Sequence, residues 1–530
     1  MTSGNWFTSF RPLSFTATPS VLRFLIAAIT GAVLSFSYTG LYLSIYSWVC
    51  IGILLIVIFG ARPLVAFGCG FLHGLLFCLT SVSWIAETLS VHGGLSLAGG
   101  WGVLLLIATV WGILIGSFAL AVHRLTFRGL GPACLGAPFL WITFEFARAH
   151  LPEISFPWNL LGYPASANPG LIQLTTITGI YGLSFLVMSF NALLAWIAIG
   201  DAQNTRRRVR FVIAAAGLIL LPSLAGKHFV PQPKAGHYAR AVQLNFPEAA
   251  SYTSDWFTQH AREMEEIERL SLKPSVSKPD LLVWPEAPVP FSFQDVQFAR
   301  VASTLAIQSQ NPFLVGAIEW KQPLDSVQTS PHVNLAPYNS ALLLDLQGQR
   351  IFVYDKIHLV PFGEYEPFPF IHRVVNSVSD EVGGFRKGNN YSVAHLPRGF
   401  RAGVFICYEA IYAGEVRRFA ANGAQLFINI SNDGWFGHSA AAEQHLRMAR
   451  VRAVENRRWI VRATNSGITA SIDPYGNIFR PLPVDVRAAT DLPYDFRTDL
   501  TIYSRFGDWF AWLCVLVSVI LVATTFRKAK

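Results

Sequence analysis

Three residues in the second half of the 530-residue chain could act together in covalent catalysis: Glu286, Lys356 and Cys407. Each stands close to the end of a short apolar run, and α/β folds commonly carry reactive side chains on the loops that follow such strands. A carboxylate can serve as a general base, an amine can stabilise an oxyanion, and a thiol can serve as a nucleophile. Folding must bring the three together, because they are far apart in the sequence.

Glu286 closes the motif Asp-Leu-Leu-Val-Trp-Pro-Glu, which begins at Asp280. A carboxylate that follows a hydrophobic strand and a proline is held at the edge of the sheet and partly removed from water. Partial removal from water makes a carboxylate a better proton acceptor, so the motif fits a general base. Taken alone, the motif is more typical of a glutamate exposed in a surface turn.

Lys356 lies in the motif Tyr-Asp-Lys-Ile-His-Leu-Val-Pro-Phe-Gly-Glu-Tyr, which runs from Tyr354 to Tyr365. Its ammonium group could stabilise an oxyanion and, by its charge, favour a nearby thiolate. Glu364 in the same motif could hold the lysine in place. A lone lysine is more often a solvated surface charge, so this interpretation depends on the other two motifs.

Cys407 follows the run Gly-Val-Phe-Ile, a pattern that fits a strand end leading into a helix. Backbone N–H groups at the start of a helix would lower the pKa of such a thiol. The alternative is a buried structural cysteine, as expected for the five cysteines that lie in long apolar stretches. These are Cys50, Cys69, Cys78, Cys134 and Cys514. The sequence has no Cys-x-x-Cys pair and no Cys/His metal spacing, so neither a metal nor a redox site is predicted.

The three motifs lie in a region where apolar runs alternate with helical or polar stretches, which predicts an α/β domain of two or four layers. The expected strands are 239–244, 281–284, 313–318, 340–344, 351–354, 403–406, 426–430 and 460–464. The expected helices are 254–272, 295–310, 414–422 and 441–458. Basic residues of the last helix, with His445 and Arg452 among them, could bind phosphate, but a solvated or salt-bridged face is the simpler expectation.

The rest of the chain has the composition of a membrane protein. Hydrophobic residues make up 52% of the sequence and charged residues only 14%, and the mean hydropathy is +0.39. A bilayer core about 30 Å thick needs about 20 apolar helical residues to cross it. The candidate runs are 21–37, 41–60, 64–85, 101–122, 133–146, 172–200, 211–225 and 509–526. The sequence therefore predicts about eight membrane-spanning helices.

The positions of Lys and Arg predict how these helices are oriented. Arginines follow the second and fourth runs, an arginine cluster follows the sixth, and Arg527 follows the last. Because such residues mark cytoplasmic loops, both termini are expected in the cytoplasm. The expected domains are 1–226 with seven helices, 227–507 as a catalytic domain outside the cytoplasm, and 508–530 with the last helix. These loops account for the net charge of +9, so nucleic acid is not an expected partner.

The order of Glu286, Lys356 and Cys407 resembles that in the nitrilase superfamily, whose members form thioester intermediates. Five segments resemble those of one of its families, the apolipoprotein N-acyltransferases. They are Val283-Trp-Pro-Glu286, Lys356-Ile-His-Leu-Val-Pro-Phe-Gly-Glu364-Tyr365, Cys407-Tyr408-Glu409, Asn432-Asp-Gly-Trp-Phe-Gly437 and Phe156-Pro-Trp-Asn-Leu-Leu-Gly-Tyr163. The lysine motif together with Cys-Tyr-Glu in a polytopic chain is specific, and the resemblance covers nearly the whole sequence.

The resemblance implies a polytopic helical membrane domain and a four-layer αββα nitrilase-like domain. It makes Cys407 the nucleophile, Glu286 the general base and Lys356 the oxyanion stabiliser. The residues expected to support them are Glu364, Tyr408 and Glu409. No cofactor or metal is expected.

The activity implied by the resemblance is transfer of a fatty acyl chain through a cysteine thioester. The expected donor is a phospholipid, specifically phosphatidylethanolamine. The expected acceptor is the N-terminal diacylglyceryl-cysteine of an apolipoprotein, in the last step of lipoprotein maturation. The expected location is the bacterial inner membrane, with the catalytic domain in the periplasm. The alternative is a membrane-tethered amidase or nitrilase that delivers the acyl group to water.

Substrates of this kind keep their acyl chains in the bilayer, because exposing each CH₂ group to water costs about 0.8 kcal/mol. The catalytic domain therefore needs an apolar mouth that receives lipid. The candidates for this mouth are Phe362, Phe368, Phe370, Trp435 and Phe436. Ordinary core packing is an equally good interpretation of these aromatic residues.

Overall fold

The computed structural model describes residues 18–152, 155–199, 230–247, 255–287, 291–323, 335–365 and 384–526, with isolated residues between 210 and 223. Its contacts divide the chain into two compact units. The first contains Met1–Ser83, Gly102–Val230 and Asp508–Lys530, and the second contains Trp84–Trp101 and Pro231–Gly507.

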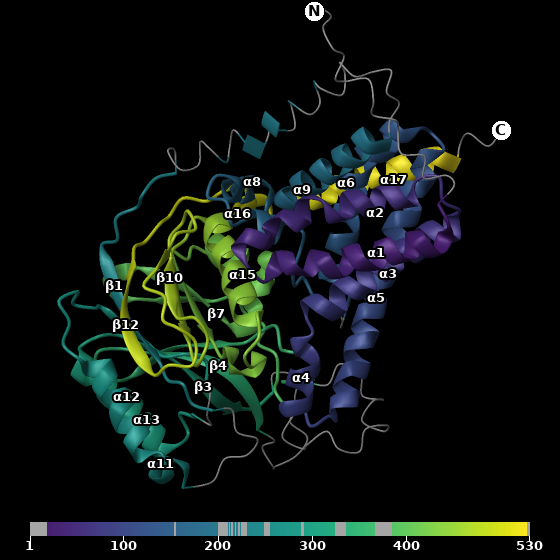
Figure 1. Cartoon of the computed structure of the whole chain (residues 1–530). Helices are drawn as coiled ribbons and strands as arrows, with labels where there is room; N and C mark the ends of the chain where they lie inside the picture. Colours follow the sequence, from purple (N-terminus) through teal and green to yellow (C-terminus); the bar gives the residue numbers. More distant parts are fainter. Residues whose placement is uncertain are drawn as a thin grey trace, which may run out of the picture. The chain divides into compact units, whose positions relative to one another are not determined.

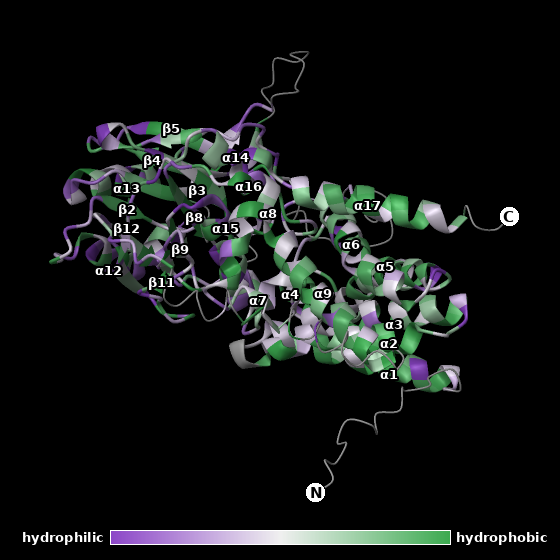
Figure 2. Ribbon diagram, turned by 90° about the horizontal axis from the view of Figure 1, so that it is seen from above, coloured by the Kyte–Doolittle hydropathy of each residue, from purple (hydrophilic) through white to green (hydrophobic). Residues whose placement is uncertain are grey.

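Long apolar helices make up most of the first unit (Figures 1 and 2). Among the described residues, six helices are long and apolar enough to cross a membrane. They are α1 (Ser20–Ser35), α3 (Pro63–Ser81), α5 (Leu97–Thr126), α6 (Leu130–His150), α9 (Ile180–Ile199) and α17 (Trp509–Phe526). They correspond to six of the eight apolar runs in the sequence. The run 211–225 lies largely outside the described residues.

The second apolar run of the sequence is not one continuous helix. It forms the 3₁₀ helix η3 (Leu41–Trp48) and the short helix α2 (Cys50–Ile58). Asn191 of α9 satisfies backbone groups at the break: its Nδ2 donates to the carbonyl oxygen of Ser47 at 2.8 Å, and its Oδ1 accepts from the N–H of Gly52 at 2.7 Å. Unpaired backbone groups are costly in an apolar environment, so an interrupted helix needs such a partner.

The second unit contains two six-stranded sheets, with the strand orders β12-β1-β2-β3-β4-β5 and β11-β10-β9-β8-β7-β6. The first sheet consists of β1 (His237–Gln243), β2 (Leu281–Val283), β3 (Phe313–Lys321), β4 (Ala336–Leu344), β5 (Arg350–Asp355) and β12 (Ala488–Tyr494). The second consists of β6 (Val393–His395), β7 (Arg401–Ile406), β8 (Leu426–Ser431), β9 (Ile460–Thr464), β10 (Ala470–Ile472) and β11 (Ile478–Phe479). All the strands expected from the sequence are present, and β6, β10, β11 and β12 are additional.

Helices flank the two sheets of this unit (Figure 1). Helices α12 (Ala261–Leu272) and α13 (Val296–Ser309) contact the first sheet, whereas α14 (Ala413–Ala421) contacts the second and has α15 (Ala441–Asn456) beside it. The sheets contact each other, for example through β1 with β9 and β4 with β7. The four-layer αββα fold is therefore confirmed. The expected helix 254–272 is divided into α11 (Trp256–Gln259) and α12 at His260.

Buried strands end at the positions that carry the candidate site. Strand β2 is a fully buried Leu-Leu-Val segment, and the indole of the next residue, Trp284, donates to Oγ of Ser271 at 3.0 Å. This anchor fixes the chain just before Glu286. Strand β7 runs parallel to β8, so the residues that follow the two strands emerge at the same edge of the second sheet.

Helix α15 is more deeply buried than the sequence suggests. His445 and Arg452 are both 0% exposed, so of the two expected environments, a solvated face and a salt-bridged face, only the salt-bridged one applies to them. Arg452 is satisfied within the protein, because its Nη2 donates to Oε1 of Glu455 at 3.1 Å. Buried charged groups must be paired in this way, and composition alone does not show that these residues are buried and paired.

Candidate active site

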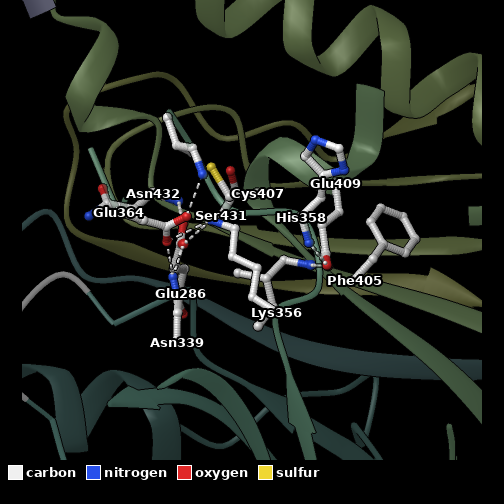
Figure 3. Close-up of polar contacts among 12 residues, drawn as sticks. Glu286, Asn339, Lys356, His358, Glu364, Phe405, Cys407, Glu409, Ser431 and Asn432 are labelled. Atoms are coloured by element: carbon white, nitrogen blue, oxygen red, sulfur yellow. Dashed lines mark hydrogen bonds and ion pairs between the residues drawn. The ribbon is translucent and has the colours of Figure 1, made fainter. Parts of the chain in front are cut away.

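The structure brings the three candidate residues together in the second unit. Glu286, Lys356 and Cys407 follow β2, β5 and β7, and their exposed fractions are 5%, 1% and 5%. Nζ of Lys356 lies 3.0 Å from Oε1 of Glu286 and 2.9 Å from Oε1 of Glu364. Cys407 lies in the same cluster (Figure 3), where Glu286 and Lys356 both act electrostatically on its thiol. The acid, the amine and the thiol thus share one buried site.

Two asparagines orient the carboxylates of this cluster. Nδ2 of Asn339, in β4, donates to Oε1 of Glu286 at 2.7 Å and to Oε1 of Glu364 at 2.6 Å. The N–H of Asn432, which follows β8, donates to Oε2 of Glu286 at 2.8 Å. Both oxygens of Glu286 therefore accept hydrogen bonds, one from a residue within β4 and one from the residue after β8, and the carboxylate has a fixed orientation.

The backbone of Cys407 adopts an unusual conformation. Its φ is 48°, in the left-handed region that residues with a side chain seldom adopt. The 3₁₀ helix η8 (Cys407–Ile411) begins at this residue, directly after β7. Nε2 of His445 donates to the carbonyl oxygen of Cys407 at 3.0 Å, and Nδ1 of the same ring lies 3.0 Å from Oδ1 of Asp433. This buried network holds the nucleophile at the end of its strand despite the strain.

The thiol of the site differs from the expected activated nucleophile, whereas the amine is cationic as expected. Burial, together with the charge of Glu286, raises the pKa of Cys407, and the opposing effect of Lys356 is smaller. The expectation of a thiol with a lowered pKa is therefore wrong for the substrate-free protein. Burial alone would lower the pKa of Lys356, but Glu286 and Glu364 outweigh it and raise that pKa well above its usual value. At neutral pH the site holds a protonated thiol and a cationic lysine.

Glu409 supports both the residue before the thiol and the segment around the catalytic lysine. Its Oε2 accepts from the N–H of Ile406 at 2.7 Å, and its Oε1 accepts from the N–H of Ile357 at 2.7 Å and from the hydroxyl of Tyr354 at 2.8 Å. The Glu409 carboxylate therefore links the segment after Lys356 to the segment before Cys407. Burial raises the pKa of Glu409 to about 7.

Sequence comparison finds relatives that extend over most of the chain. An apolipoprotein N-acyltransferase from Geobacter metallireducens is 33% identical over 95% of this chain and 95% of that protein. The chain belongs to the apolipoprotein N-acyltransferase family. A second apolipoprotein N-acyltransferase, from Allorhizobium ampelinum, is 31% identical over 81% of this chain and 80% of that protein.

Two family models match separate parts of this member of the N-acyltransferase family. The model of the apolipoprotein N-acyltransferase N-terminal domain matches residues 30–193, and the carbon-nitrogen hydrolase model matches residues 239–486. Among solved structures, a branch 10 member of the nitrilase superfamily from Saccharomyces cerevisiae is 18% identical, with a TM-score of 0.35 over 48% of this chain and 90% of that chain.

In this member of the N-acyltransferase family, the aromatic residues expected to form a lipid mouth differ in their exposure and in their contacts. Phe362 is half-buried, and Trp435 is 37% exposed. Phe436 packs edge-on against Trp84, with ring centroids 4.8 Å apart, and the Trp435 carbonyl accepts from Oγ1 of Thr88 at 2.7 Å. Phe368 and Phe370 lie outside the described residues. The contact with lipid stays a prediction for all of them.

Some residues of the site could not be found from the three motifs. Asn339 lies inside a mostly apolar strand. A polar residue in such a strand needs a buried hydrogen-bond partner, and this was the only sequence feature that pointed to it. Folding brings His445 and Asp433 close to Cys407, so the three motifs do not indicate them. In the described part of the chain, no group of three or more His, Cys, Asp or Glu side chains is arranged to hold a metal ion.

Proposed function

We propose that this protein transfers a fatty acyl chain from a phospholipid to the N-terminal diacylglyceryl-cysteine of an apolipoprotein. The observation that carries the proposal is the buried cluster of Glu286, Lys356 and Cys407 in a chain whose described residues include six potential membrane-spanning helices. Membership of the N-acyltransferase family supports the choice of acceptor. Phosphatidylethanolamine is the donor we infer.

In the first half-reaction, Glu286 takes the thiol proton of Cys407 as the sulfur attacks the ester carbonyl carbon of the donor. A base inside the site is required, because the buried thiol has a raised pKa. The ammonium group of Lys356 stabilises the negative charge on the carbonyl oxygen of the tetrahedral intermediate. The carbon–oxygen bond then breaks, the alkoxide of the lysophospholipid takes the proton from Glu286, and the acyl chain remains on Cys407 as a thioester.

In the second half-reaction, the neutral amino group of the diacylglyceryl-cysteine attacks the thioester carbonyl carbon. Glu286 takes a proton from the attacking nitrogen, and Lys356 again stabilises the oxyanion. The carbon–sulfur bond breaks, and the thiolate of Cys407 takes the proton from Glu286. Division into two steps lets one oxyanion site serve both tetrahedral intermediates.

We infer that the protein spans the bacterial inner membrane several times, with the catalytic domain in the periplasm and both termini in the cytoplasm. The support for this orientation is the placement of arginines after alternate apolar runs. A membrane location also fits the substrates, because each CH₂ group withdrawn from the bilayer costs about 0.8 kcal/mol.

A membrane-tethered amidase that delivers the acyl group to water is the second candidate, since it would use the same three residues. The burial of all three side chains favours an acceptor that binds in place of water. The test is to incubate the purified protein with phosphatidylethanolamine and a diacylated lipopeptide. N-acylated lipopeptide is the expected product, and release of free fatty acid alone would favour the second candidate, an amidase or nitrilase relative that delivers the acyl group to water.

A further inference from the structure

The charge of the catalytic cluster is unfavourable for a phospholipid. Two carboxylates contact the single ammonium group of Lys356: that of the buried Glu286 and that of Glu364, whose side chain is 13% exposed. A phospholipid brings a phosphodiester anion within a few bonds of the ester carbonyl that is attacked. In a buried, weakly screened site this anion is repelled by the excess carboxylate, unless a further cation lies nearby.

A basic segment runs beside the catalytic lysine. The N–H of Gly388 donates to the carbonyl oxygen of Lys356 at 2.8 Å, and the N–H of Phe385 donates to the carbonyl oxygen of Glu364 at 3.3 Å. These bonds hold both ends of a short stretch against the lysine motif. The two residues between them, Arg386 and Lys387, are exposed. Two exposed cationic residues therefore lie in a stretch whose backbone is bonded to Lys356 and Glu364.

The side chain of Lys387 is directed at an aromatic residue of the same motif. Its Nζ lies 4.8 Å from the centre of the Tyr365 ring, within the range of a cation–π contact. Burial and, to a smaller degree, Tyr365 raise the pKa of Tyr408, the residue that follows Cys407. Tyr365 therefore lies near enough to Tyr408 to act on it electrostatically, and Lys387 contacts Tyr365 while remaining exposed and accessible to an anion.

We propose that Lys387, positioned by Tyr365, binds the phosphate of the acyl donor at the rim of the active site. An ammonium group is a suitable partner because it binds phosphate as a compact point charge with several rotatable donors. Arg386 adds positive charge to the same rim. This assignment rests on the proposed function and concerns the first half-reaction alone, because the diacylglyceryl-cysteine acceptor has no phosphate.

The test measures the two half-reactions separately in nonionic detergent, where the donor is the only phosphate-bearing lipid and no membrane surface is present. Acylation of Cys407 by phosphatidylethanolamine is followed by intact-protein mass, and transfer from fully loaded acyl-enzyme to a diacylated lipopeptide is followed in a second assay. Lys387→Gln is compared with Lys387→Arg, which keeps the charge. The matched control is Lys273→Gln, which removes an exposed lysine at the end of α12.

For Lys387→Gln, acylation is expected to slow by about tenfold or more, as for loss of a charge-assisted contact, with transfer unchanged. Lys387→Arg is expected to restore most of the acylation rate, and Lys273→Gln to match the wild type. The assignment is overturned if acylation by Lys387→Gln equals the wild type, if both half-reactions slow equally, or if Lys273→Gln slows acylation to the same extent. A wild-type protein that forms no acyl-enzyme would instead contradict the proposed function.

Discussion

The ammonium group of Lys356 lies 3.0 Å from a carboxylate oxygen of Glu286, and both side chains are almost completely buried. Their mutual attraction keeps the lysine cationic although burial opposes the charge. The same contact places the proposed base beside the proposed oxyanion stabiliser. This ion pair therefore holds together the general base and the oxyanion stabiliser, both of which acyl transfer to and from a thiol requires.

Replacement of Lys356 with methionine is expected to slow thioester formation by about 100-fold or more, because an oxyanion donor is lost. The rate is measured as acyl-enzyme formed in a single turnover with phosphatidylethanolamine. Lys321→Met is the matched control, because Lys321 pairs with Asp355 at 2.5 Å outside the cluster and is 31% exposed. A Lys356→Met rate within a few-fold of this control would contradict the assigned role.

Asn339 is expected to be required for its two amide contacts and not for its size. Asn339→Asp has the same shape but places a third carboxylate against Glu286 and Glu364, so its activity should fall further than that of Asn339→Ala. Loss of a single hydrogen bond to a charged group costs about 1.5–3 kcal/mol, or about tenfold to a hundredfold in rate. Steady-state acyl transfer by both variants tests this order. An aspartate variant that is the more active of the two would show that the amide does not support the carboxylates.

Thr88 is expected to influence acyl transfer through the loop that contains Trp435. Its hydroxyl donates to the Trp435 carbonyl, and the same loop begins with Asn432, which orients Glu286. Thr88→Val should lower the rate about fivefold, as for loss of a hydrogen bond worth about 1 kcal/mol. Thr109→Val is the control, because that hydroxyl bonds only within its own helix, to Leu105 at 2.8 Å. Equal acyl-transfer rates for Thr88→Val and Thr109→Val would contradict an influence of Thr88 on the active site.

The stability of the protein is expected to depend on pH through Glu409. Burial raises its pKa from 4.5 to about 7, so the folded protein binds more protons than the unfolded chain between these values. The stability that Glu409 contributes is present below about pH 4.5 and is lost as the pH rises through about 7. Glu409→Gln cannot titrate, so the unfolding temperature of the wild type should fall relative to that of this variant as the pH rises across that interval. Unfolding temperatures in one detergent test this, and a wild-type value that rises relative to the variant would contradict it.

The sequence allowed prediction of the residues that directly follow strands. Glu286 and Cys407 come after short apolar runs that form strands, so local pattern was sufficient to place them at sheet edges. Asn339 was missed because its contacts are made across the sheet from inside a strand. The raised pKa of Cys407 was also missed, because it depends on burial and on Glu286, a residue distant in the sequence.

Long-range contacts also explain where the observed helices differ from those expected from the sequence. The apolar run that includes η3 and α2 has enough hydrophobic residues for one span, and only the position of Asn191 shows why an interruption is stable. His445 was expected on a solvated or salt-bridged helix face, whereas the fold buries it between the carbonyl of Cys407 and the carboxylate of Asp433. Such contacts are formed by tertiary packing and leave no periodic signal in the sequence.

Identification of the acyl-enzyme tests the role of Cys407 as nucleophile. The purified protein is exposed to phosphatidylethanolamine without acceptor, and the mass of the peptide that contains Cys407 is determined before and after addition of a diacylated lipopeptide. We expect one hydroxylamine-sensitive acyl group on Cys407, which disappears as N-acylated lipopeptide forms and is absent from Cys407→Ala. Transfer of the acyl chain by Cys407→Ala at the wild-type rate, or N-acylated product without any acyl group on this thiol, would contradict it.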